Sequence, residues 1–67
     1  MREWLLELRK AAGMSERAVA EAAGISQPSY HRIETGTRNP TVATAKLIGE
    51  VLDFRWTRFF SDEAKVS

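Results

Sequence analysis

The stretch from residue 15 to residue 40, SERAVAEAAGISQPSYHRIETGTRNP, constrains the fold more than any other part of the chain. Ala20 and Gly24 are small residues at positions where two short helices would cross closely. Gly24 is expected to end the first helix, because a left-handed backbone costs glycine least. Ser26 then offers a side-chain oxygen that can cap the second helix. The pattern predicts two short helices joined by a tight glycine turn.

The apolar residues of this stretch fit the same arrangement. They are Val19, Ala23, Ile25, Tyr30 and Ile33. A helix-turn-helix of this kind, here covering about residues 15–35, commonly lays its second helix in the major groove of DNA. DNA binding is therefore the first function that the pattern predicts.

Length and composition limit the remaining choices. The 67 residues suit one small domain over 1–67, and 43% hydrophobic residues are too many for a disordered chain. The absence of cysteine excludes a disulfide framework and a thiolate metal site. No apolar run is long enough to span a membrane, and the first residues do not resemble a signal peptide. The net charge of +1 only weakly favours a nucleic-acid partner, so the distribution of charge over the surface matters more.

Helical spacing of apolar residues predicts two longer helices on either side of this unit and a short fifth helix. The first helix ends at Gly13 and has the apolar positions Trp4, Leu5, Leu8, Ala11 and Ala12. The fourth follows a cap at Thr41 and has the apolar positions Val42, Ala45, Ile48, Val51 and Leu52. Aromatic residues between 54 and 60 indicate the fifth helix, and residues 61–67 are expected to form a frayed tail. The expected fold is all-α.

The order of the helices and the phrase GMSERAVAEAAGISQPSYHRIETGTRNPT resemble the Cro and phage-repressor class of helix-turn-helix proteins, also called XRE-type regulators. The resemblance runs from about residue 5 to residue 60. Its most specific positions are Ala20, Gly24, Ile25, Ile33, Glu34, Gly36, Asn39 and Pro40. It implies a compact, lambda-repressor-like domain of five helices that binds operator DNA, usually as a dimer.

The resemblance also implies particular residue roles. It implies a structural ion pair between Arg9, at the end of the first helix, and Glu34, at the end of the third. One position departs from the family. Glu16 stands where the family often has a glutamine that holds a phosphate and braces the third helix. A carboxylate cannot donate a hydrogen bond and repels phosphate.

The outer face of the predicted helix over residues 27–35 carries the residues expected to contact bases. They are Gln27, Pro28, Ser29, His31 and Arg32. Arg32 is the strongest of these, because its planar guanidinium can pair with O6 and N7 of guanine, although it could also bind phosphate. Gln27 suits adenine or a phosphate, Pro28 also fits a plain helix start, and His31 also fits an exposed polar position.

A second set of residues is expected to contact the DNA backbone. They are Arg17, Thr35, Thr37, Arg38 and Asn39. Arg38 favours phosphate because charge neutralisation supplies most of non-specific affinity. Ordinary loop and cap chemistry is the alternative for Arg38 and Asn39 and for the hydroxyl groups of Ser29, Thr35 and Thr37. The single histidine and the lone Glu34 have no partners that would make a metal or catalytic site. We therefore expect no enzymatic activity, no metal and no cofactor.

Four aromatic residues near the end of the chain are a large set for so small a core. They are Phe54, Trp56, Phe59 and Phe60. Rings left exposed would mark a dimer interface, which would set two recognition helices about 34 Å apart. The alternative is that all four rings are buried within one chain.

The sequence as a whole predicts a sequence-specific DNA-binding transcriptional regulator, expected to be a repressor that acts by operator occupancy. Its partners would be double-stranded DNA and, at least on DNA, a second copy of the chain. The alternative is an antitoxin-type protein-interaction module that binds a toxin through its aromatic end, with DNA binding secondary. Either protein is expected in the cytoplasm of a bacterium, encoded by it or by a phage, and associated with the nucleoid.

Overall fold

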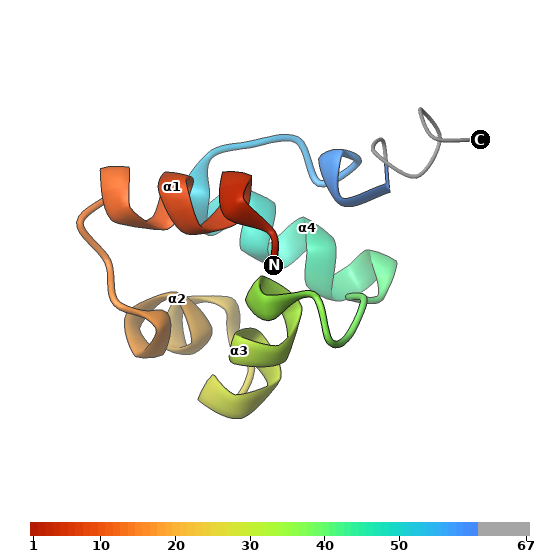
Figure 1. Cartoon of the computed structure of the whole chain (residues 1–67), viewed down its shortest axis with the longest axis horizontal. Helices are drawn as coiled ribbons and strands as arrows, with labels where there is room; N and C mark the ends of the chain where they lie inside the picture. The colour runs from red at the N-terminus through yellow and green to blue at the C-terminus, as the bar shows by residue number, and fades with distance from the viewer. Residues whose placement is uncertain (61–67) are drawn as a thin grey trace.

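The computed structural model describes residues 1–60, and helices dominate this part of the chain. They are α1 (Glu3–Ala11), α2 (Glu16–Ala23), α3 (Gln27–Thr35) and α4 (Val42–Leu52). Residues 58–60 are helical again, and no strand occurs within 1–60. In Figure 1, α1 and the chain that follows α4 lie on one side of the domain, and α2 and α3 lie on the other. The predicted all-α fold is confirmed, while the predicted tail at 61–67 lies outside the described residues.

The predicted ends of the helices are confirmed in the backbone. Side-chain oxygens cap three of the helices by accepting a backbone N–H from the third residue along, and these caps are Ser15, Ser26 and Thr41. Gly24 ends α2 with φ 76°, and Gly36 ends α3 with φ 87°. Both values lie in the left-handed region, where glycine has no Cβ to clash. The turn between α2 and α3 is therefore fixed by local chemistry.

The core lies where α2 packs on both α3 and α4. Its buried apolar residues are Leu5, Val19, Ala20, Ala23, Tyr30, Ile33, Ala45, Ile48, Leu52 and Phe59. Val42 was predicted to belong to the apolar stripe of α4, and this is wrong, because Val42 is 49% exposed. It is the first residue of α4, at the end of the helix that projects past α2 and α3 in Figure 1.

The chain after α4 turns sharply and rests on Gly49. Asp53 ends the helix in a left-handed conformation with φ 58°. A Cβ on Gly49 would lie 2.7 Å from the carbonyl oxygen of Phe54 and 3.3 Å from the backbone nitrogen of Trp56. The absence of a side chain at Gly49 thus lets the backbone of residues 54–56 pack directly on α4.

This turn also corrects the start of the fifth helix. The aromatic spacing predicted helix from about Phe54, but residues 54–57 form a turn and helix begins at residue 58. The chain must first reverse at Asp53 and cross Gly49, so a helix cannot begin before that turn is complete.

Candidate nucleic-acid interface

The two faces of α3 differ sharply in exposure. Tyr30, Ile33 and Glu34 are buried against the rest of the domain. Four of the five residues predicted to contact bases are exposed on the other face: Gln27, Pro28, His31 and Arg32. The fifth, Ser29, is half-buried on the flank. Burial of one face therefore holds the other in a fixed orientation toward solvent.

The buried face of α3 is fixed by an ion pair with α1. The Arg9 Nε donates to Glu34 Oε2 at 3.1 Å, and Arg9 Nη2 donates to Glu34 Oε1 at 3.1 Å. The Glu34 side chain is 1% exposed. Arg9 Nη1 also donates to the carbonyl oxygen of Met14, 3.0 Å away. The hydrogen bonds to Glu34 raise the pKa of the Arg9 guanidinium, so Arg9 stays charged.

Tyr30 lies beside this pair and is fully buried. Burial raises the pKa of its phenol above the ordinary value of 10.0, and the negative charge of Glu34 raises it further. The Tyr30 hydroxyl has no hydrogen-bond partner among residues 1–60. The hydroxyl is therefore a buried, neutral polar group next to the Arg9–Glu34 pair.

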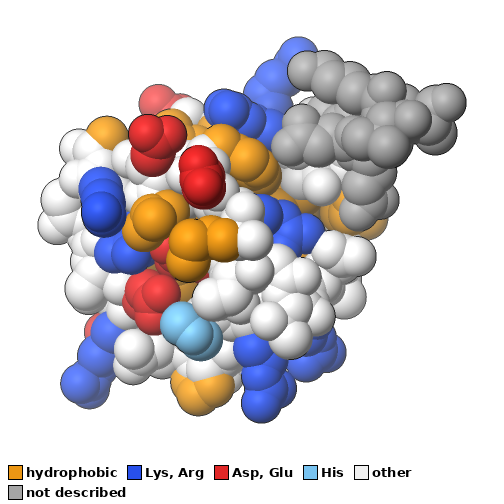
Figure 2. All heavy atoms as spheres, viewed as in Figure 1, with side chains coloured by type: hydrophobic (Ala, Val, Ile, Leu, Met, Phe, Trp, Pro, Cys, Tyr) orange, Lys and Arg blue, Asp and Glu red, His pale blue; other side chains and the backbone are white. Residues whose placement is uncertain are grey.

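The outer face of α3 makes one contact back to α2. His31 Nδ1 lies 3.1 Å from each carboxylate oxygen of Glu16. Figure 2 shows an acidic side chain next to the pale blue histidine, with Lys and Arg side chains gathered along the lower edge of the same face. The sequence singled out both residues separately. The family resemblance indicated that position 16 contacts the third helix, but it did not indicate His31 as the partner, which lies fifteen positions along the chain.

The hydroxyl groups of the predicted set are engaged in local contacts. The Ser29 hydroxyl lies 2.8 Å from the hydroxyl of Ser26 at the start of α3. Thr35 Oγ1 donates to the carbonyl oxygen of Arg32 at 3.2 Å and lies 3.1 Å from Thr37 Oγ1. These three predicted contacts therefore take part in cap and turn structure, which was the alternative drawn from the sequence.

The loop after α3 is held in place by a residue that the sequence did not single out. Arg2 donates to the carbonyl oxygens of Ile33 and Arg38 and, over 2.6 Å, to Asn39 Oδ1. Asn39, predicted to contact the DNA backbone, thus accepts a hydrogen bond within the protein. Arg38 is exposed, and its backbone N–H donates to the carbonyl oxygen of Arg32 at 3.1 Å. No local sequence pattern predicts this role of Arg2, because its partners lie 31 to 37 residues away along the chain.

Arg17 lies on the exposed side of α2. Its Nε is 3.3 Å from Glu21 Oε2, and both side chains are mostly exposed. Such a pair is weak in water and can exchange its partner for phosphate at little cost.

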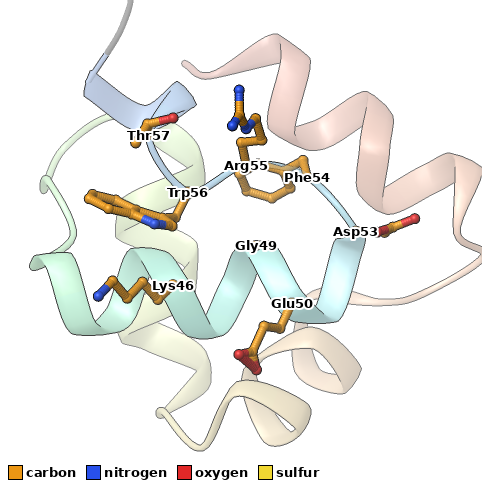
Figure 3. A pocket seen from close by; sticks show the side chains of 8 residues that line it. All are labelled: Lys46, Gly49, Glu50, Asp53, Phe54, Arg55, Trp56 and Thr57. Atoms are coloured by element: carbon orange, nitrogen blue, oxygen red, sulfur yellow. The ribbon is translucent and has the colours of Figure 1, made fainter.

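The aromatic residues near the end of the described chain pack mainly within the domain. Phe59 is buried, while Phe54, Trp56 and Phe60 are half-buried. The rings of Phe54 and Phe59 each pack edge-on against the ring of Trp4, with 5.2 Å between ring centroids in both pairs. Figure 3 shows Trp56 above Lys46 of α4. The ammonium group of Lys46 lies 5.3 Å from the centre of the Trp56 ring. Sequence reasoning did not connect Trp4 with this cluster.

Two further observations concern other kinds of site. No helix within residues 1–60 is long and apolar enough to cross a membrane. Over the same residues, histidine, aspartate and glutamate side chains do not gather in groups that could hold a metal ion.

Comparison with known proteins places this geometry among regulators. The helix-turn-helix family model HTH_3 matches residues 5–59. The uncharacterized HTH-type transcriptional regulator YqaF of Bacillus subtilis (strain 168) is 48% identical over 62 residues, which are 92% of this chain and 82% of that protein. A protein of Methanocaldococcus jannaschii assigned as an HTH-type transcriptional regulatory protein is 43% identical over 49 residues, 73% of this chain and 15% of that protein.

A solved structure has the same fold. The crystal structure of an HTH_3 family transcriptional regulator from Vibrio cholerae matches with a TM-score of 0.74 and 32% identity. The match covers 97% of this chain and 36% of that chain. The present chain thus spans most of YqaF but only a minor part of the other two relatives.

Proposed function

The chain belongs to the HTH_3 helix-turn-helix family and is a DNA-binding transcriptional regulator, and we propose that it represses transcription by occupying an operator through the outer face of α3. The observation that carries this proposal is the division of α3 into two faces. Tyr30, Ile33 and Glu34 anchor one face in the core, which leaves Gln27 and Arg32 exposed on the other. A helix held this way can enter the major groove with its N-terminal residues first.

We assign base contacts to the exposed residues of α3, with Arg32 pairing with guanine and Gln27 with adenine or a phosphate. Pro28 and Ser29 lie at the start of the helix, where they would contact a thymine methyl group or the backbone. Arg17 on α2 and Arg38 in the loop after α3 are exposed, and their positive charges are suited to phosphates.

We also propose that two copies occupy one operator. Two recognition helices spaced by one DNA turn, about 34 Å, would match two half-sites. The half-buried edges of Phe54, Trp56 and Phe60 are the surface that we assign to the contact between copies. Sedimentation with duplexes that carry one or two half-sites tests this, since two copies should bind only the longer duplex together.

The relatives favour a regulator over the antitoxin-type alternative, because their names describe transcriptional regulators. For the same reason we propose that the chain has no catalytic role. A protein that binds an operator acts where the DNA is, so we place it in the cytoplasm, with the nucleoid.

Binding-site selection from random duplexes, followed by titration at several salt concentrations, tests the proposed function. We expect a preferred duplex and an affinity that falls steeply with salt, because bound phosphates release counterions. Placing the selected duplex across a promoter upstream of a reporter should lower expression in cells that make the protein. Equal affinity for all duplexes at every salt concentration would contradict sequence-specific regulation.

A further inference from the structure

The contact between Glu16 and His31 joins the first residue of α2 to the exposed face of α3. Both carboxylate oxygens of Glu16 lie 3.1 Å from the same ring nitrogen, Nδ1. Glu16 is 25% exposed, whereas the His31 side chain is 56% exposed. The carboxylate is thus partly sheltered, and the ring stays open to solvent on its other side.

The chemistry of the two groups fixes where the imidazole proton lies. An ionised carboxylate can only accept hydrogen bonds, so Nδ1 must carry a hydrogen to bond with it. In a neutral imidazole the other nitrogen, Nε2, then carries none and is an acceptor. Within residues 1–60, no donor reaches Nε2 to satisfy it. The ring therefore offers an acceptor to whatever approaches the outer face of α3.

We propose that Glu16 is a positioning residue that sets the tautomer of His31, so that neutral His31 recognises an exocyclic amino group of adenine or cytosine in the major groove. This inference rests on the proposed function. Among the groups at base edges in the major groove, only adenine N6 and cytosine N4 donate hydrogen bonds. A single hydrogen bond of this kind distinguishes base pairs by about three- to tenfold.

A comparison of base preference for four proteins tests the proposal. They are the wild type and the variants His31→Ala, Glu16→Gln and Glu21→Gln. Glu21→Gln is the matched control, because it removes the same charge from an exposed position of α2 that faces Arg17. Each protein is titrated against the selected duplex and its single-base-pair variants at about pH 8 and at one salt concentration.

We expect wild type to prefer an amino-bearing base at one position of each half-site by about three- to tenfold. His31→Ala should remove that preference and leave the other positions unchanged. Glu16→Gln should strengthen binding to all duplexes and also weaken the preference at the His31 position, because an amide can donate or accept and so allows either tautomer. Glu21→Gln should not alter the preference.

Three outcomes would overturn the proposal, and they differ in what else they reject. Absence of any preference in wild type would reject the proposed function as well. A clear wild-type preference that His31→Ala leaves intact at every position would reject only the role of His31. If Glu16→Gln strengthens binding but leaves the preference at the His31 position unchanged, Glu16 acts only through its charge. Thermal melting followed by circular dichroism checks that each variant is folded.

Discussion

Arg9 and Glu34 face each other across the interface between α1 and α3, with two guanidinium nitrogens on the two carboxylate oxygens at 3.1 Å each. The pair lies 25 residues apart in the sequence, and Glu34 is almost fully buried. The paired geometry fixes the angle at which α3 leaves the core. The Arg9–Glu34 pair therefore orients the outer face of α3 from the buried side of the helix.

Glu34→Ala should destabilise the fold by about 3 to 5 kcal/mol, because it leaves the Arg9 charge without its partner in a poorly hydrated place. Urea unfolding followed by circular dichroism measures this difference. The matched control is Glu21→Ala, which breaks the exposed pair with Arg17 and should change stability by less than about 1 kcal/mol. Similar stabilities for the two variants would show that the Arg9–Glu34 pair is open to water.

Tyr30 should resist ionisation for as long as the protein stays folded. Its pKa in the folded state is raised, so its contribution to stability is complete below the ordinary value of 10.0 and is lost as the pH rises above it. Between pH 10.0 and the raised pKa of Tyr30 in the folded protein, this group alone should lower the free energy of unfolding by about 1.4 kcal/mol for each pH unit. Tyr30 is the only tyrosine, so the ultraviolet absorbance of tyrosinate reports on it directly.

The matched variant for this experiment is Tyr30→Phe, which removes a buried hydroxyl that has no partner within the described residues. The variant should lie within about 1 kcal/mol of wild type at neutral pH, because the hydroxyl makes no well-formed hydrogen bond and only lies close to the Glu34 carboxylate. It should also lack the extra alkaline loss of stability. Tyrosinate that forms near pH 10.0 in wild type, with the circular dichroism unchanged, would show that the hydroxyl is accessible to water.

Much of the fold follows from local chemistry, and therefore from the sequence. Ser15, Ser26 and Thr41 cap helices because a hydroxyl at that position meets a free backbone N–H three residues later, and no distant contact is needed. Gly24 and Gly36 end helices for an equally local reason. Helix periodicity likewise separated the buried and exposed faces of α3.

The parts that sequence reasoning missed depend on contacts between distant segments. Arg2 holds the loop after α3 by reaching residues more than thirty positions away, and no spacing rule contains that information. Asn39 was predicted to contact a phosphate because the sequence does not indicate that Arg2 donates a hydrogen bond to its side chain. His31 and Glu16 were each assessed alone, although their meeting gives the ring its direction. The late start of the fifth helix depends on the backbone contact between Phe54 and Gly49.

Gly49→Ala should destabilise the protein by about 1 to 3 kcal/mol, although alanine is the better helix former. The new Cβ would lie 2.7 Å from the carbonyl oxygen of Phe54, and a backbone atom cannot swing aside as a side chain can. Thermal melting gives the comparison. Glu50→Ala, at the next and exposed position of α4, should be nearly neutral. A Gly49→Ala variant with unchanged or higher stability would mean that the turn over α4 moves easily.

Arg32→Ala should weaken specific DNA binding without weakening the fold. Arg32 is exposed on the face of α3 opposite Tyr30 and Ile33, so its side chain adds little to the core. Loss of a two-point contact with guanine should reduce the affinity for the selected duplex by about 1 to 3 kcal/mol and relax the preference at one base position of each half-site. Titrations on the selected duplex and its single-base-pair variants measure both effects.

Arg38→Ala is the matched comparison, because it removes the same charge from an exposed position just beyond α3. A contact with phosphate carries no sequence information, so this variant should weaken binding to all duplexes alike. The slope of log affinity against log salt concentration should fall by about one, as expected for the loss of one phosphate contact. Both variants should melt at the wild-type temperature. If Arg32→Ala weakened every duplex equally, Arg32 would bind phosphate, and base recognition would fall to Gln27, Ser29 and His31.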